Sequence, residues 1–241
     1  MDAIAKTMDK IDQNRIDREQ ARAIPLHLLR LVSQSLPVGG FSYSRGLEHA
    51  VRAGRVSDEA TANAWILGTL QHNIAQLDGA LFWRMAGALG DGDHQRFFHF
   101  NDWLRAARES REFQLEDERM GSALRRLLVS LSVPLAKAGK DDKLTFAAAF
   151  ALAAHHWNIA ADDALQGLLW IYVEGQVMAA IRLIPIGQTA GQRILVDSVD
   201  AIGRAETLAR SLPDDEIGSV APALAMASAW HETQYSRLFQ S

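Results

Sequence analysis

The segment from Asp162 to Ile184 constrains the fold more than any other part of the chain. Beyond its start it carries only two charged side chains, Glu174 and Arg182. A helix that is apolar on nearly every side has to be surrounded by other elements of the protein. Elsewhere, two-residue alternation is rare, and Ala and Leu dominate the long segments. We therefore predict an all-α fold, a single-domain helical bundle of about eight to ten helices.

The composition is that of an ordinary globular protein and excludes several classes of function. The chain has 241 residues, of which 48% are hydrophobic and 22% charged, so it can bury a sizeable core. The net charge of −4 does not indicate the positively charged surface that nucleic-acid binding requires. Cysteine is absent, which excludes disulfides, thiolate nucleophiles and cysteine-based metal sites.

Two apolar runs raise the question of a membrane. The run Leu144 to Ala154 is too short to span a bilayer, whereas Ala164 to Gly187 is long enough. Polar side chains interrupt the longer run, and Pro185 ends it. We interpret both runs as core helices. Because the first residues also lack the apolar core of a secretory signal, we predict a cytoplasmic protein with no membrane contact.

Changes in composition along the chain suggest three parts. Residues 1–24 mix both charge signs and are expected to form a flexible lead-in. Residues 25–230 are expected to form the all-α domain, with an internal loop at Lys137 to Lys143. Residues 231–241 are expected to form a tail.

The sequence contains few of the motifs and residue spacings that are typical of catalytic sites. It contains no GxxxxGK[ST], HExxH or GxSxG motif. The eight histidines are dispersed, with no i, i+4 pair suited to a metal. The adjacent carboxylates Asp162 and Asp163 are expected to cap a helix, and Arg111 to Glu118 to form a charged helix face. We predict no catalytic residue, no cofactor and no metal site, and hence a protein that is not an enzyme.

The stretch Ser35 to Glu48 combines a chain reversal with two aromatic side chains. Pro37 and the adjacent glycines favour a turn before a new helix. Phe41 and Tyr43 lie at the mouth of that turn. Two interpretations remain open: the rings pack onto the first turn of the helix as a hydrophobic staple, or they form a surface for a partner.

The tail is unusually aromatic for a chain end. Tyr235, Leu238 and Phe239 accompany Arg237, a composition typical of interface hot spots. The alternative is a last segment packed on the protein's own core. Glu174 leaves a similar choice, because a charge on a central helix needs a partner. It either lines a polar channel, faces another subunit or forms a buried ion pair with an arginine.

Three motifs in the same order resemble one known family. The run LLRLVSQSLPVGGFSYSRGLEHAVRAGRV (Leu28 to Val56) resembles the N-terminal signature of the urease accessory protein UreF family. EGQVMAAIRLIPIGQTAGQRIL (Glu174 to Leu195) resembles its second signature, with Glu174 where the family more usually carries Asn. The final HETQYSRLFQS resembles its terminal block.

The resemblance implies an all-α homodimer that assembles with UreD (UreH in some species) and the GTPase UreG. That complex delivers nickel to apo-urease, whose metal-bridging lysine must be carbamylated. By position, the resemblance assigns six residues to the UreD-facing surface: Phe41, Tyr43, Tyr235, Arg237, Leu238 and Phe239. The expected function is that of a urease maturation factor, a nickel-insertion chaperone that bridges UreG and UreD to apo-urease. The alternative is a GTPase-activating regulator of UreG.

Overall fold

The computed structural model describes residues 25–137 and 143–241. The predicted lead-in, residues 1–24, and the centre of the predicted loop, residues 138–142, lie outside the described residues. Throughout the described part of the chain all regular structure is helical, and one continuous hydrophobic core is buried. This confirms the prediction of a single-domain all-α fold.

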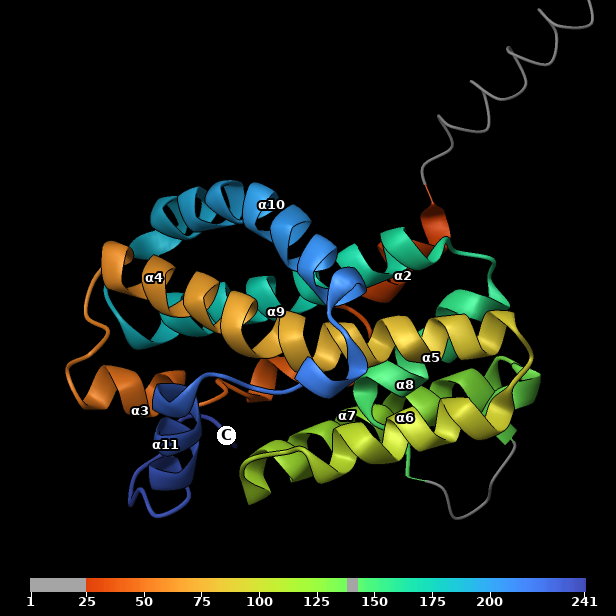
Figure 1. The fold of residues 1–241 in the computed structure, drawn as a ribbon. Helices are drawn as coiled ribbons and strands as arrows, with labels where there is room; N and C mark the ends of the chain where they lie inside the picture. Colours follow the sequence, from red (N-terminus) through yellow and green to blue (C-terminus); the bar gives the residue numbers. More distant parts are fainter. Residues whose placement is uncertain (1–24, 138–142) are drawn as a thin grey trace, which may run out of the picture.

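The helices follow one another with short connections (Figure 1). In chain order they are α2 (Leu26–Val32), η1 (Gly40–Ser42), α3 (Leu47–Arg52), α4 (Glu59–Thr69), η2 (Leu70–Gly79), α5 (Ala80–Gly90), α6 (His94–Ala106), α7 (Arg111–Ser130), η3 (Pro134–Lys137), α8 (Phe146–His156), α9 (Ala161–Leu183), α10 (Gly187–Ser211), η4 (Asp214–Glu216) and α11 (Pro222–His231).

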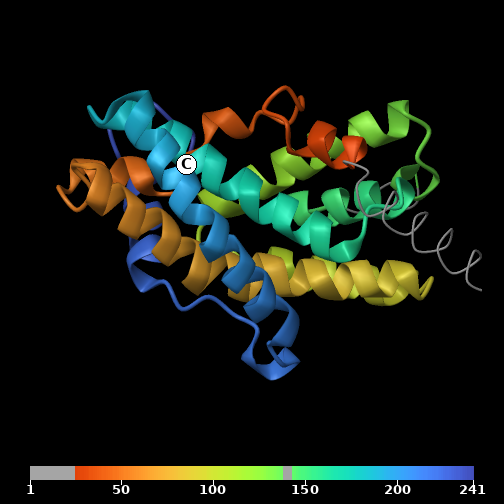
Figure 2. The same cartoon turned by 90° about the horizontal axis from the view of Figure 1, so that it is seen from above.

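Helix α9 lies at the centre, as its apolar sequence predicts. It packs against α2, α3, α4, η2, α5, α8 and α10, and Figures 1 and 2 show it enclosed among them. Of the described helices it alone is long and apolar enough to cross a membrane, and 61% of its most apolar 18-residue window is buried inside the protein. That burial is typical of a core helix. The predicted cap is wrong: α9 begins after Ala160 with no side-chain cap, and Asp162 forms an ion pair with Arg210 (3.1 Å).

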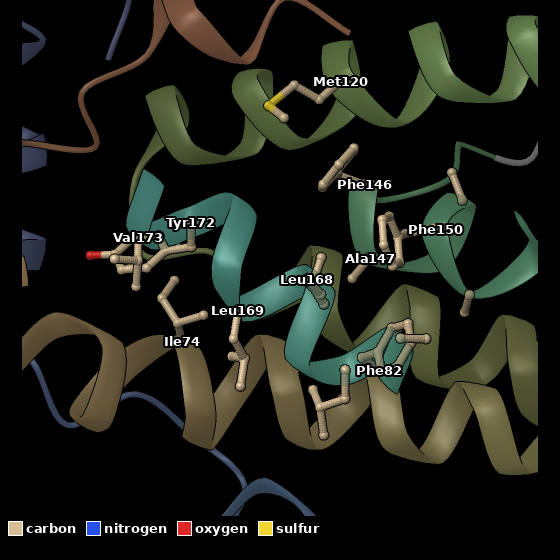
Figure 3. Packing of buried hydrophobic residues seen from close by; sticks show 14 of the residues in the cluster. Ile74, Phe82, Met120, Phe146, Ala147, Phe150, Leu168, Leu169, Tyr172 and Val173 are labelled. Carbon is tan, nitrogen blue, oxygen red and sulfur yellow. The ribbon is translucent and has the colours of Figure 1, made fainter. Parts of the chain in front are cut away.

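The core is built by large side chains from several helices. Figure 3 shows Phe82 of α5, Phe146 and Phe150 of α8, and Leu168 and Tyr172 of α9 within one cluster. The rings of Phe82 and Phe150 lie 6.2 Å apart and are tilted, an arrangement that aromatic pairs prefer. The Ala-rich α8 thus contributes its rings to the centre.

Helices α4, η2 and α5 form one long rod (Figure 1). Its middle section, η2, is a π-helix, which has i→i+5 hydrogen bonds and therefore more residues per turn than an α-helix. The wider turn moves later side chains around the rod. Within this section the polar side chains of Asn73 and Asp78 are buried.

Helices α7 and α8 approach each other most closely at Gly121. A Cβ atom at this position would lie 2.0 Å from the carbonyl oxygen of Leu144, a backbone atom that a side-chain rotation cannot move. The close packing of α7 on the start of α8 therefore requires glycine.

We predict opposite effects for one substitution at two helical glycines. Gly121→Ala should lower the free energy of unfolding by about 1–3 kcal/mol or more, because the backbone of α8 has to move. Gly87→Ala should raise it by about 0.5–1 kcal/mol, because Gly87 is exposed within α5 and nothing lies within 4 Å of its added Cβ. Urea denaturation measures both, and equal effects would contradict the close approach.

Candidate functional site

The tail lies along the segment that joins η1 to α3. The backbone amide of Gln240 donates to the carbonyl oxygen of Ser42 (2.8 Å), and the amide of Ser44 donates to the backbone oxygen of Ser241 (2.8 Å). In Figure 1 the C-terminus lies close to α3 and α11. The turn and the tail that the sequence singled out are therefore neighbours in space.

Buried carboxylates beneath the tail accept hydrogen bonds from it. Glu48 of α3 accepts hydrogen bonds from the amides of Leu238 (2.7 Å) and Phe239 (2.9 Å), one on each oxygen. Glu116 of α7 accepts a hydrogen bond from the hydroxyl of Ser241 (2.8 Å). Hydrogen bonds to charged groups are stronger than neutral ones, so these contacts fix the course of the tail.

His231, the last residue of α11, is fully buried between two carboxylates. Its Nδ1 lies 2.8 Å from Glu112 of α7, and its Nε2 lies 3.2 Å from Glu48. Either nitrogen can donate to the carboxylate that it faces, and His231 thereby connects α11 to α3 and α7. Burial raises the pKa of Glu112, although His231 and Arg237 (Nη1 to Oε1 2.8 Å) act in the opposite direction.

The six predicted site residues lie on two segments that the structure joins by hydrogen bonds, but their side chains are oriented differently. Phe41, Tyr235 and Leu238 are exposed, at 74%, 102% and 56% respectively. Tyr43 and Phe239 are buried in the core. The exposure of Phe41 excludes a staple role for it, whereas the tail packs on its own core through Phe239. The role of the six residues in partner binding remains a prediction.

Arg182 links the turn to the tail. Its Nη1 donates to the carbonyl oxygen of Phe41 (3.2 Å), and its guanidinium lies 4.8 Å from the centre of the Phe239 ring. Sequence reasoning noted Arg182 only as a charge on an apolar helix. Nothing in its spacing indicated that it would meet two segments so distant in the sequence.

Glu174 is half-buried and lines a cavity of about 170 Å³ between α2, η1, α7 and α9. Most lining side chains are apolar, and burial raises the pKa of Glu174 despite hydrogen bonds with Gln34 and Trp170. Within residues 25–137 and 143–241 no basic side chain forms an ion pair with it. The buried ion pair is therefore not found, and the polar channel remains a prediction.

A second buried network was missed. Arg108, between α6 and α7, binds both oxygens of Asp78 (2.9 and 2.7 Å) and also Asp117 (2.7 Å). Arg111 to Glu118 was interpreted as an exposed charged face, yet Glu112, Glu116 and Asp117 are buried. One signal was available, because Asp117 continues the apolar stripe of Phe113, Met120 and Leu124 at spacings of 4, 3 and 4.

The region combines an inward polar network with exposed apolar side chains. Glu48, Glu112 and Glu116 bind His231, Arg45 or the tail, whereas Phe41, Tyr235 and Leu238 are exposed. In the part of the chain that the structure describes, no group of three or more His, Asp or Glu side chains could hold a metal ion. By its architecture the chain is an all-helical accessory-type protein without a described metal site, with exposed apolar side chains beside a tail that is hydrogen-bonded to its core.

Comparison with known proteins gives the family. The UreF family model matches residues 56–199. The urease accessory protein UreF 2 of Brucella anthropi is 59% identical over 221 residues, which are 91% of this chain and 97% of that protein. The UreF proteins of Teredinibacter turnerae and Alkalilimnicola ehrlichii are 43% and 41% identical, over 90% and 89% of this chain and 98% and 94% of theirs. The chain belongs to the UreF family, which confirms the resemblance and supports a role in urease maturation.

We predict that Asp78→Asn is strongly destabilising and that its effect depends on pH. Burial alone raises the pKa of Asp78, but the charge and hydrogen bonds of Arg108 outweigh it, so the pKa lies below its ordinary value. A carboxylate whose pKa is lowered by folding stabilises the protein at pH values above its unfolded pKa, about 3.9. This stabilisation is lost as the pH falls through the folded pKa. The variant should lose about 3–5 kcal/mol at pH 7, and less below about pH 4.

Denaturation with urea across this pH range tests the prediction. Asp102→Asn is the control, because Asp102 is 66% exposed in its pair with Arg105 and should change stability by less than about 1 kcal/mol. A loss for Asp78→Asn that is as small as that of the control would contradict the role of the buried network.

We predict that Glu48→Gln loosens the tail. The amide keeps one acceptor oxygen but loses the second, together with the charge facing His231. Since hydrogen bonds to charged groups contribute about 1.5–3 kcal/mol, the amides of Leu238 and Phe239 should exchange hydrogen at least about tenfold faster. Glu118→Gln, which removes a surface pair with Lys143 (2.9 Å), is the matched control and should leave this exchange unchanged.

Proposed function

We propose that this protein is a non-enzymatic adaptor in urease maturation that bridges UreG and UreD (UreH) to apo-urease. One observation carries the proposal beyond family membership: the two segments that the resemblance assigns to UreD lie together, with backbone hydrogen bonds between Ser42 and Gln240 and between Ser44 and Ser241. Such a fixed surface costs less conformational entropy on binding than two separate flexible segments.

The exposed side chains of that region support a partner surface. Phe41, Tyr235 and Leu238 expose apolar area beside Arg237, and aromatic residues and arginine are the residue types enriched in interface hot spots. The buried members, Tyr43 and Phe239, would act indirectly by holding the turn and the tail in place.

We further propose that the protein works as a cytoplasmic homodimer that presents two UreG molecules to each other. Binding that differs between the GTP and GDP forms of UreG would couple nucleotide hydrolysis to the release of nickel towards apo-urease. In this scheme nickel is cargo, and nucleotide chemistry belongs to UreG.

The proposal predicts that the exposed apolar residues are needed for capture of UreD. Phe41→Ser combined with Leu238→Ser should weaken the affinity for UreD by at least about tenfold and lower urease activation, because hot-spot side chains contribute about 2 kcal/mol or more. Neither side chain is buried, so the fold should persist. Affinity capture with tagged UreD, and urease activity in cells that express the accessory proteins, measure the two effects.

Leu131→Ser is the matched control, because Leu131 is a 45% exposed apolar residue just beyond the opposite end of α7. Unchanged capture and activation by the double variant would contradict the assigned surface. Acceleration of GTP hydrolysis when this protein is added to UreG with nickel and bicarbonate would favour the GTPase-activating alternative.

A further inference from the structure

We propose that Arg119 and Arg182 make the surface beside the tail a receptor for an acidic partner surface. This inference rests on the proposed function and adds the chemistry of the partner: apolar side chains that cover Phe41 and Leu238, with carboxylates that pair with the two guanidinium groups. We call the set Phe41, Arg119, Arg182, Leu238 and Gln240 the tail face.

A series of contacts makes the tail face continuous. Arg182 of α9 donates to the carbonyl oxygen of Phe41 (3.2 Å). The next residue of η1, Ser42, accepts from the amide of Gln240 (2.8 Å), and the Oε1 of Gln240 accepts from Nη1 of Arg119 on α7 (2.8 Å). Three elements and the tail therefore meet at one surface, and an arginine stands on each side of the tail.

The positive charge of these two arginines is not compensated within the described residues. Arg119 binds a neutral amide, and Arg182 binds a carbonyl oxygen and the Phe239 ring. Two exposed arginines elsewhere differ in this respect: Arg193 pairs with Glu59, and Arg210 pairs with Glu206. A guanidinium has five N–H donors, so both groups retain donors for a carboxylate.

Three carboxylates of this region lie buried beneath the tail, whereas Glu232 at the start of the tail is exposed. Glu48, Glu112 and Glu116 are buried, and all three are hydrogen-bonded to the tail, to His231 or to Arg45. The five residues of the tail face include no carboxylate, so a partner that covers this face meets the guanidinium groups of Arg119 and Arg182. Charge complementarity then selects a partner surface rich in Asp and Glu.

The two arginines are also partly ordered before a partner binds. The guanidinium of Arg182 is held over the Phe239 ring at 4.8 Å, and Arg119 is held by the amide of Gln240. Ordering in advance lowers the entropy cost of forming bidentate bonds to carboxylates, for which the planar guanidinium is suited. Arginine is therefore the fitting residue type at both positions.

The test is the salt dependence of UreD binding by a charge-reversed variant. Arg119→Glu combined with Arg182→Glu should weaken binding at least about tenfold at about 50 mM salt, because like charges then face each other across the interface. The deficit should shrink at about 0.5 M salt, where screening shortens the range of charge interactions. Arg204→Glu on α10, exposed and with no ion pair among the described residues, is the control and should bind like the wild type.

Because Arg182 also packs on Phe239, a double variant that removes the two charges without reversing them provides a second test. Arg119→Gln with Arg182→Gln should weaken binding in the same salt-dependent manner but less, while the thermal midpoint stays near that of the wild type. A loss that is equal at both salt concentrations, or undiminished binding by the reversed variant, would overturn the inference alone. Absence of UreD binding by the wild type would overturn the proposed function and this inference together.

Discussion

Burying a carboxylate costs several kcal/mol unless donors compensate it, and α7 buries three of them in six residues. The donors come from separate parts of the chain. Arg108 reaches Asp117 from the preceding loop, the amide of Phe146 reaches it from the start of α8, and Glu116 meets Arg45 (2.6 Å). Because the buried carboxylates of α7 need donors, one network of contacts connects α7 with α3, η2, α8 and the tail.

The same requirement explains why the end of the chain is ordered on the protein. The tail supplies backbone amides to Glu48 and a guanidinium to Glu112, while His231 bridges the two carboxylates. With these donors committed inward, the tail is fixed on the protein while the apolar side chains of Tyr235 and Leu238 stay exposed.

The sequence predicted much of this architecture because its signals are local. The apolar run predicted the central helix, and Pro37 with the adjacent glycines predicted the turn before a new helix, where Gly39 has a positive φ of 74°. Two local predictions failed for non-local reasons. Asp162 pairs with Arg210 instead of capping α9, and part of the charged run on α7 is buried because Arg108 and the tail are there to meet it.

The sequence by itself determined that this chain is an all-α protein with α9 at its centre, because a helix without a polar face must be enclosed. It also singled out two segments, the aromatic turn and the aromatic tail, as candidates for partner binding. Only the tertiary structure decided that these segments touch, that Tyr43 and Phe239 face inward while Phe41 and Leu238 face outward, and that Arg182 joins them. Contacts between residues more than 140 positions apart depend on how helices pack against one another, and helical periodicity does not predict that packing.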